Sequence, residues 1–161
     1  LKIEGRMKTA LYVATVARTY RKALDDLEKG REVYEQNLPW YEQQITGCTY
    51  RRFTTGFFYG KPDENSQIYD SNTYEKDYVY LGIAGQPDAA GVFDLEQRNK
   101  FSVGETIEIM KPDGRNIEVT VEHIQDLEGN EQESAPHAKQ ALKVKLSSAP
   151  EAMDILRRKD F

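Results

Sequence analysis

Basic side chains gather at the start of the chain, and they are its best candidates for contact with a ligand. The first 22 residues contain a single acidic residue and six basic ones: Lys2, Arg6, Lys8, Arg18, Arg21 and Lys22. Residues 1–60 carry a net charge of +3, whereas residues 61–161 carry −8. A polyanion such as RNA would therefore meet the N-terminal segment first. The competing interpretation is that these charges only solvate an exposed helix face.

A second group of candidates is aromatic and lies in the middle of the chain. Residues 51–62 read Arg-Arg-Phe-Thr-Thr-Gly-Phe-Phe-Tyr-Gly-Lys-Pro. Aromatic rings interleaved with arginine suit stacking on unpaired bases, which makes Arg51, Phe53 and Phe57 candidate RNA contacts. The same composition suits a connector that docks on a neighbouring domain, and the sequence leaves both interpretations open.

No catalytic constellation is visible elsewhere. The histidines, His123 and His137, are not paired by any motif with a nucleophile, and a triad is defined by geometry rather than by chain order. Cys48 is the only cysteine, so the chain by itself forms neither a disulfide nor a thiolate metal cage. We therefore predict no cofactor or metal in this chain. We also expect a reducing, cytoplasmic setting, and no apolar run approaches the length of a membrane span.

The basic residues must be positioned by a long helix, which the spacing predicts from Thr9 to about Lys29. Thr9 can cap its first turn and Gly30 can end it. Apolar residues recur every three or four positions and form one stripe: Val13, Val16, Ala17, Tyr20, Leu24 and Leu27. The stripe must lie against something larger, or it stays exposed and promotes self-association. A shorter helix is predicted to begin at Asn37 and to end near Ile45.

From Tyr78 the apolar period changes to two, which predicts short antiparallel strands. Segments 78–84, 92–95, 106–110, 117–124 and 141–146 alternate in this way, and Pro112-Asp113-Gly114 is a strong turn signal. The tail from Asp154 to Arg158 fits a closing strand or one helical turn, and we favour the strand. Such strands bury a shared interior by curling into a small barrel or sandwich, and the barrel is the expected form. The fold class is therefore α+β, with residues 1–77 and 78–161 as the two expected domains.

Four blocks of this chain resemble peptidase family U-32, the collagenase-like peptidases. They are Lys2-Ile3-Glu4-Gly5-Arg6-Met7-Lys8, the pattern of Arg51, Phe53, Thr54, Gly56 and Phe57, the pattern of Phe101, Gly104, Glu105, Ile107 and Glu108, and Asp154-Ile155-Leu156-Arg157-Arg158. The resemblance implies that residues 1–77 end a TIM-like catalytic barrel, with Lys2–Glu4 as its last strand. It also implies a C-terminal β-barrel similar to the second domain of translation elongation factors.

The same resemblance frames the functional expectation. Residues at the C-terminal ends of barrel strands reach the active site, so Glu4 and Arg6 are weak catalytic candidates. We expect a non-catalytic, substrate-positioning region of a collagenase-like peptidase, a hydrolase whose upstream catalytic domain performs proteolysis. This fragment alone would be inactive. The alternative is a part of an enzyme that hydroxylates the wobble uridine of tRNA, with an iron–sulfur cluster in the parent protein and the basic helix on the RNA.

Overall fold

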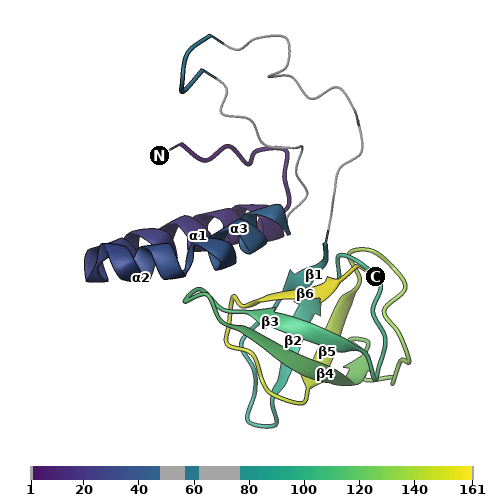
Figure 1. Cartoon of the computed structure of the whole chain (residues 1–161). Helices are drawn as coiled ribbons and strands as arrows, with labels where there is room; N and C mark the ends of the chain where they lie inside the picture. The colour runs from purple at the N-terminus through teal and green to yellow at the C-terminus, as the bar shows by residue number, and fades with distance from the viewer. Residues whose placement is uncertain (1, 48–56, 62–76, 161) are drawn as a thin grey trace.

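The computed structural model describes residues 2–47, 57–61 and 77–160, and it shows helices followed by a six-stranded antiparallel sheet (Figure 1). The helices are α1 (Ala10–Lys29), α2 (Arg31–Gln36) and α3 (Leu38–Thr46). The strands are β1 (Tyr78–Ile83), β2 (Val92–Glu96), β3 (Thr106–Met110), β4 (Asn116–Gln125), β5 (Ala141–Leu146) and β6 (Ile155–Lys159). The α+β class is confirmed. None of the helices described is both long and apolar enough to cross a membrane.

Helix α1 spans the residues for which the apolar spacing predicted a helix. Its N-cap is Thr9, whose hydroxyl oxygen accepts a hydrogen bond of 3.3 Å from the backbone N–H of Tyr12. The helix ends at Gly30, which has a φ of +142° and so takes a conformation that L side chains rarely adopt. Asn37 precedes α3, and Pro39 occupies its first turn, as expected.

The expected strand at Lys2–Glu4 is wrong for this chain. These residues form no regular secondary structure, and their side chains are exposed. A strand is stable only when a neighbouring strand takes its backbone hydrogen bonds, and no described part of the chain lies beside this segment as a partner strand. A remnant of a TIM-like barrel therefore stays a prediction.

The strands pair in the order β1-β6-β3-β4-β5-β2, and every pair is antiparallel. The two outer strands approach each other through the bridge between Ala84 and Leu95 and a 2.9 Å hydrogen bond from the Arg98 N–H to the Leu81 carbonyl. The C-terminal tail is strand β6, as predicted. The closed barrel and its likeness to an elongation-factor domain stay predictions.

The sheet encloses its own hydrophobic core. Alternate residues of the strands point inward, and the fully buried side chains include Leu81, Phe93, Ile107, Ile124 and Leu156. None of the helical residues belongs to this main cluster. The sheet thus has a complete interior without the helices, and the helices must be attached to it by other contacts.

Candidate functional site

Helix α1 packs on the sheet through a narrow face that combines apolar and polar residues. A small apolar cluster forms where Leu11 meets Met110 of β3 and Ile155 of β6. One turn further along the helix, the Thr15 hydroxyl donates a 3.4 Å hydrogen bond to the Met110 sulfur. The next residue on this face is Arg18, which is only 6% exposed. The helix is therefore held by a few specific contacts rather than by a broad apolar surface.

Arg18 is the anchor of this junction. Its guanidinium donates hydrogen bonds to the Lys111 carbonyl at 3.0 Å, the Asn116 side-chain oxygen at 3.0 Å and the Gln44 side-chain oxygen at 2.5 Å. The Trp40 ring lies 5.7 Å from its central carbon, close enough for a cation–π contact. One side chain thereby joins α1, α3 and the β3–β4 turn.

The β3–β4 turn is shaped to accept these helices. Gly114 in the turn has a φ of +97°, and a Cβ added there would lie 2.9 Å from the Lys22 side chain and 3.2 Å from the Trp40 ring. A larger residue would strain the backbone and push the helices away. The predicted turn is therefore also a docking element, which its sequence alone did not indicate.

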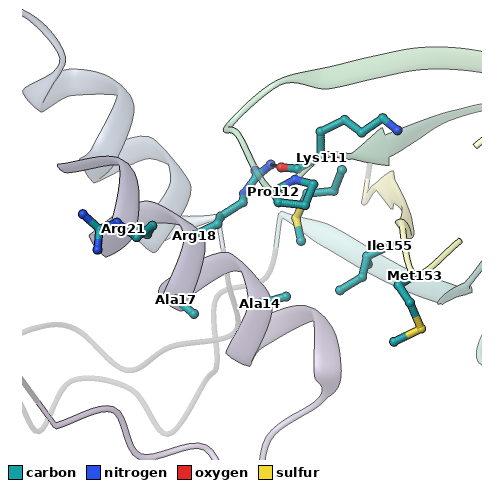
Figure 2. A pocket seen from close by; sticks show the side chains of 9 residues that line it. Ala14, Ala17, Arg18, Arg21, Lys111, Pro112, Met153 and Ile155 are labelled. Carbon is teal, nitrogen blue, oxygen red and sulfur yellow. Dashed lines mark hydrogen bonds between the residues drawn. The ribbon is translucent and has the colours of Figure 1, made fainter. Parts of the chain in front are cut away.

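A groove of about 340 Å³ runs between α1 and the sheet beside this junction (Figure 2). Its walls include Ala14, Ala17, Met110, Pro112, Met153 and Ile155. Figure 2 shows Arg18 reaching from α1 to the turn that holds Lys111 and Pro112. The Lys111 side chain pairs with Asp154 at 2.6 Å. Although burial alone would lower the pKa of Lys111, the hydrogen bonds and charges of its carboxylate partners outweigh burial and raise it.

The predicted RNA contacts fall into separate groups. Arg6, Lys8 and Arg21 are exposed, and Arg21 forms an ion pair with Asp25 on the next turn. Arg18 is buried in the junction, so it is not presented to a ligand as predicted: hydrogen-bond acceptors from distant parts of the chain surround it.

Lys22 is partly buried, with its ammonium 2.7 Å from Asp26 and 5.8 Å from the centre of the Trp40 ring. Its contacts are therefore mainly structural. Phe57 is 79% exposed, whereas Arg51 and Phe53 lie outside the described residues.

The weak catalytic candidates, Glu4 and Arg6, lie in the exposed segment that precedes α1. The Glu4 carboxylate lies 3.8 Å from the Lys2 ammonium, and both side chains are more than two-thirds exposed, at 73% and 87%. Arg6 is also exposed. An exposed pair at this distance contributes little binding energy and no protected environment for proton transfer. A catalytic role for Glu4 and Arg6 stays a prediction.

Sequence reasoning missed the polar network between α1 and α3. The Asp26 carboxylate is buried and accepts hydrogen bonds from Lys22, Lys29, Asn37 and Tyr41 at 2.7 to 3.1 Å. The bond from Lys22 holds the pKa of Asp26 well below its usual range, despite the opposing effect of burial. Burial and the bond to Asp26 raise the pKa of Tyr41 to about 12. No periodic pattern signals such a network.

The residues of this chain do not fit an iron–sulfur cluster. Such clusters are generally held by four cysteine thiolates, and the chain has only Cys48, which lies outside the described residues. Within the described residues, no group of three His, Cys, Asp or Glu side chains could hold a metal ion. No chemical step is therefore assigned to a cluster here.

Fold and site together define a class: a helical segment fixed by one buried arginine to an antiparallel sheet with its own core. Comparison with known families identifies that class. The sequence model described as "Peptidase family U32 C-terminal domain" matches residues 76–157, and the one described as "Peptidase family U32" matches residues 1–68. The chain belongs to peptidase family U32.

Several relatives carry a more specific name. The chain is 34% identical to "tRNA hydroxylation protein P1" of Bacillus subtilis over 98% of its own length, and 33% identical to "tRNA hydroxylation protein P" of Escherichia coli over 84%. It is 25% identical to "Uncharacterized protease MJ0090" of Methanocaldococcus jannaschii over 77%. The chain spans 26% to 37% of the lengths of these relatives.

A solved structure is also similar to part of the chain. It is the C-terminal domain of a U32 peptidase from Geobacillus thermoleovorans, 29% identical in sequence with a TM-score of 0.45. The match covers 51% of this chain and 92% of that domain.

Proposed function

We propose that this chain is the tRNA-positioning part of a tRNA hydroxylation protein. The observation that supports the proposal best is the set of relatives of that name, which are 32% to 34% identical to this chain over 76% to 98% of it. Of the two functions expected from the sequence, the proposal therefore takes tRNA hydroxylation rather than proteolysis. The hydroxylation itself would take place elsewhere in the longer protein.

The charge distribution supports contact with RNA at one end of the chain. Arg6, Lys8 and Arg21 are exposed, while the remainder of the chain beyond residue 60 carries a net charge of −8. A phosphate backbone is attracted to the first group and repelled by the second. The contact would be electrostatic and independent of sequence, which suits positioning rather than readout.

Salt dependence of tRNA binding tests this proposal. Three phosphate contacts give a slope of log affinity against log salt of about −2 to −3. We expect the variant with Arg6→Gln, Lys8→Gln and Arg21→Gln to lose most of that slope and at least about tenfold in affinity at 0.1 M salt. Fluorescence anisotropy with labelled tRNA measures both quantities.

A matched control removes the same charge from the C-terminal region that contains the sheet. Lys100, Lys139 and Lys143 are all exposed, and their triple replacement by Gln changes the net charge equally. Affinity within about twofold of the parent is expected for this control. Equal losses in the two variants would mean that only overall charge matters, and absence of tRNA binding by the parent chain would refute tRNA positioning by this part.

Proteolysis is the second candidate, and the observation in its favour is the similarity to a protein named as an uncharacterized protease. Experiments on the whole protein distinguish the two candidate functions. Cells that lack the gene should lose hydroxylated uridine from their tRNA, as nucleoside mass spectrometry would show. Unchanged tRNA nucleosides together with peptide digestion by the purified protein would favour proteolysis.

A further inference from the structure

Helix α1 presents an apolar stripe on the side that faces away from the sheet. Val13, Tyr20, Leu24 and Leu27 are 39%, 39%, 43% and 50% exposed. Their spacing places them on one line along the helix. Ala17 lies at the edge of this stripe, where it is exposed and also lines the groove beside the sheet. The predicted stripe thus exists. Val16 is 8% exposed and the Val13 side chain lies beside Gly5, but the rest of the stripe remains largely uncovered by the described residues.

The helix cannot turn this stripe towards the sheet. On its opposite side, Arg18 is held by acceptors of the β3–β4 turn and by Gln44 of α3. On the α3 side, Asp26 is fixed by Tyr41 at 2.8 Å. Rotating α1 to bury the stripe would break these hydrogen bonds and leave buried groups of the other elements, such as the Gln44 side-chain oxygen, without their partners. The contacts of Arg18 and Asp26 therefore keep the stripe on the side of α1 that faces away from the sheet.

The structure assigns this surface, which we call the α1 stripe (Val13, Tyr20, Leu24 and Leu27), as the docking site for the portion of the protein that precedes this region in its longer relatives. Its occupant is an apolar face of that portion. The inference does not depend on tRNA binding. It rests on the exposed stripe, on the locked rotation of α1 and on the size of the relatives, of which this chain spans 26% to 37%.

The separate family matches support the same occupant. The helices fall within the match to "Peptidase family U32" at residues 1–68, whereas the sheet falls within the match to the C-terminal domain at residues 76–157. The helices are thus shared with the body of the family's proteins. A hollow of about 380 Å³ beside Tyr20, lined also by Ile45 and Thr46 of α3, extends the surface on which that body can rest.

The size of the stripe argues against a second copy of the chain. From Val13 to Leu27 the helix rises about 21 Å, and a helix is about 10 Å wide, so the projected area is roughly 200 Å². Stable interfaces bury about 800 Å² of accessible surface on each partner. A covalently connected partner needs less, because its effective concentration reaches the millimolar range.

The test compares how much the stripe contributes to thermal stability in this chain alone and in a longer protein. The variant combines Leu24→Gln and Leu27→Gln, which keep helix propensity because Leu and Gln have similar values. Glu28→Gln, at an exposed position next to the stripe on the same helix, is the control. Each is made in this chain and in a chimera in which the chain replaces the matching 159 residues of the Bacillus subtilis relative. Thermal unfolding is measured for both.

We expect the double variant to lower the chimera's melting temperature by at least about 4 °C and to change that of the short chain by less than about 1 °C. The control should change neither. Equal shifts in the two proteins would overturn the inference. So would a short chain that sediments as a dimer at micromolar concentration and becomes monomeric in the double variant, because the occupant would then be a second copy.

Hydroxyl-radical labelling provides a readout that does not require the chimera to fold. The stripe residues of this chain should label at least about threefold more strongly than the matching helix in the intact Bacillus relative. Equal labelling, corrected for residue type, would show that nothing covers this helix and would refute the assignment. Because neither readout involves tRNA, failure here and failure of the proposed function are distinguishable.

Discussion

Replacing Arg18 should uncouple the helices from the sheet. The Arg18 guanidinium donates to the Lys111 carbonyl at 3.0 Å, to the Asn116 side chain at 3.0 Å and to the Gln44 side chain at 2.5 Å. Hydrogen bonds to a charged group each contribute about 1.5 to 3 kcal/mol, but such contributions are not additive. Arg18→Met keeps much of the side-chain volume while removing all the donors. We therefore expect the junction to lose about 3 to 4 kcal/mol.

Urea unfolding followed by two signals measures this effect. Trp40 is the only tryptophan and lies 5.7 Å from the central carbon of Arg18, so its fluorescence reports the junction. Circular dichroism in the β region reports the sheet. With a typical slope of about 2 kcal/mol per molar urea, the Trp40 transition should move to lower urea by about 2 M. The sheet should unfold near its original midpoint, because its core contains no helical residue.

Two control variants distinguish the junction from general destabilisation. Arg21→Met, three residues further along the same helix, breaks the exposed pair with Asp25 and should leave the Trp40 midpoint almost unchanged. Arg18→Lys keeps the charge but loses the planar fork, so an intermediate loss is expected. Equal shifts for Arg18→Met and Arg21→Met would refute the argument. A sheet transition that moves together with the Trp40 transition would refute the uncoupling.

The remaining predictions concern the polar network and the turn. Asp26→Asn should cost about 3 kcal/mol at pH 7, since it leaves buried donors without their anion. The pKa of Asp26 is lowered on folding, so its stabilisation is complete above about pH 4 and declines as the pH falls, by up to about 1.4 kcal/mol per pH unit. Unfolding free energies at pH 7, 4 and 3 should therefore converge for parent and variant, and a constant difference would contradict the assignment. Gly114→Ala should lower the Trp40 unfolding midpoint, because its Cβ would lie 2.9 Å from Lys22 and 3.2 Å from the Trp40 ring. An unchanged midpoint would show that this turn does not set the position of the helices.

Part of the candidate site was predictable because it depends on local residue type. The exposed basic residues Arg6, Lys8 and Arg21 follow from their charge, since ionised side chains rarely leave water. Arg18 breaks that rule, and the sequence did not distinguish it from Arg21. Its acceptors lie 93 and 98 positions away at Lys111 and Asn116, and no local pattern reports such a distance.

Residue patterns alone were enough to predict the helix from its cap at Thr9 to Gly30, the apolar line along it, and the alternating strands from Tyr78 onward. Periodicity fixes these because backbone geometry repeats every 3.6 residues in a helix and every two in a strand. Which side of α1 meets the sheet depends instead on contacts between residues that are far apart in the chain. Hydrophobic periodicity identifies the apolar side as the buried one, but here one arginine with its distant acceptors, together with Leu11, holds the opposite side against the sheet. The apolar side is left available for another part of the protein.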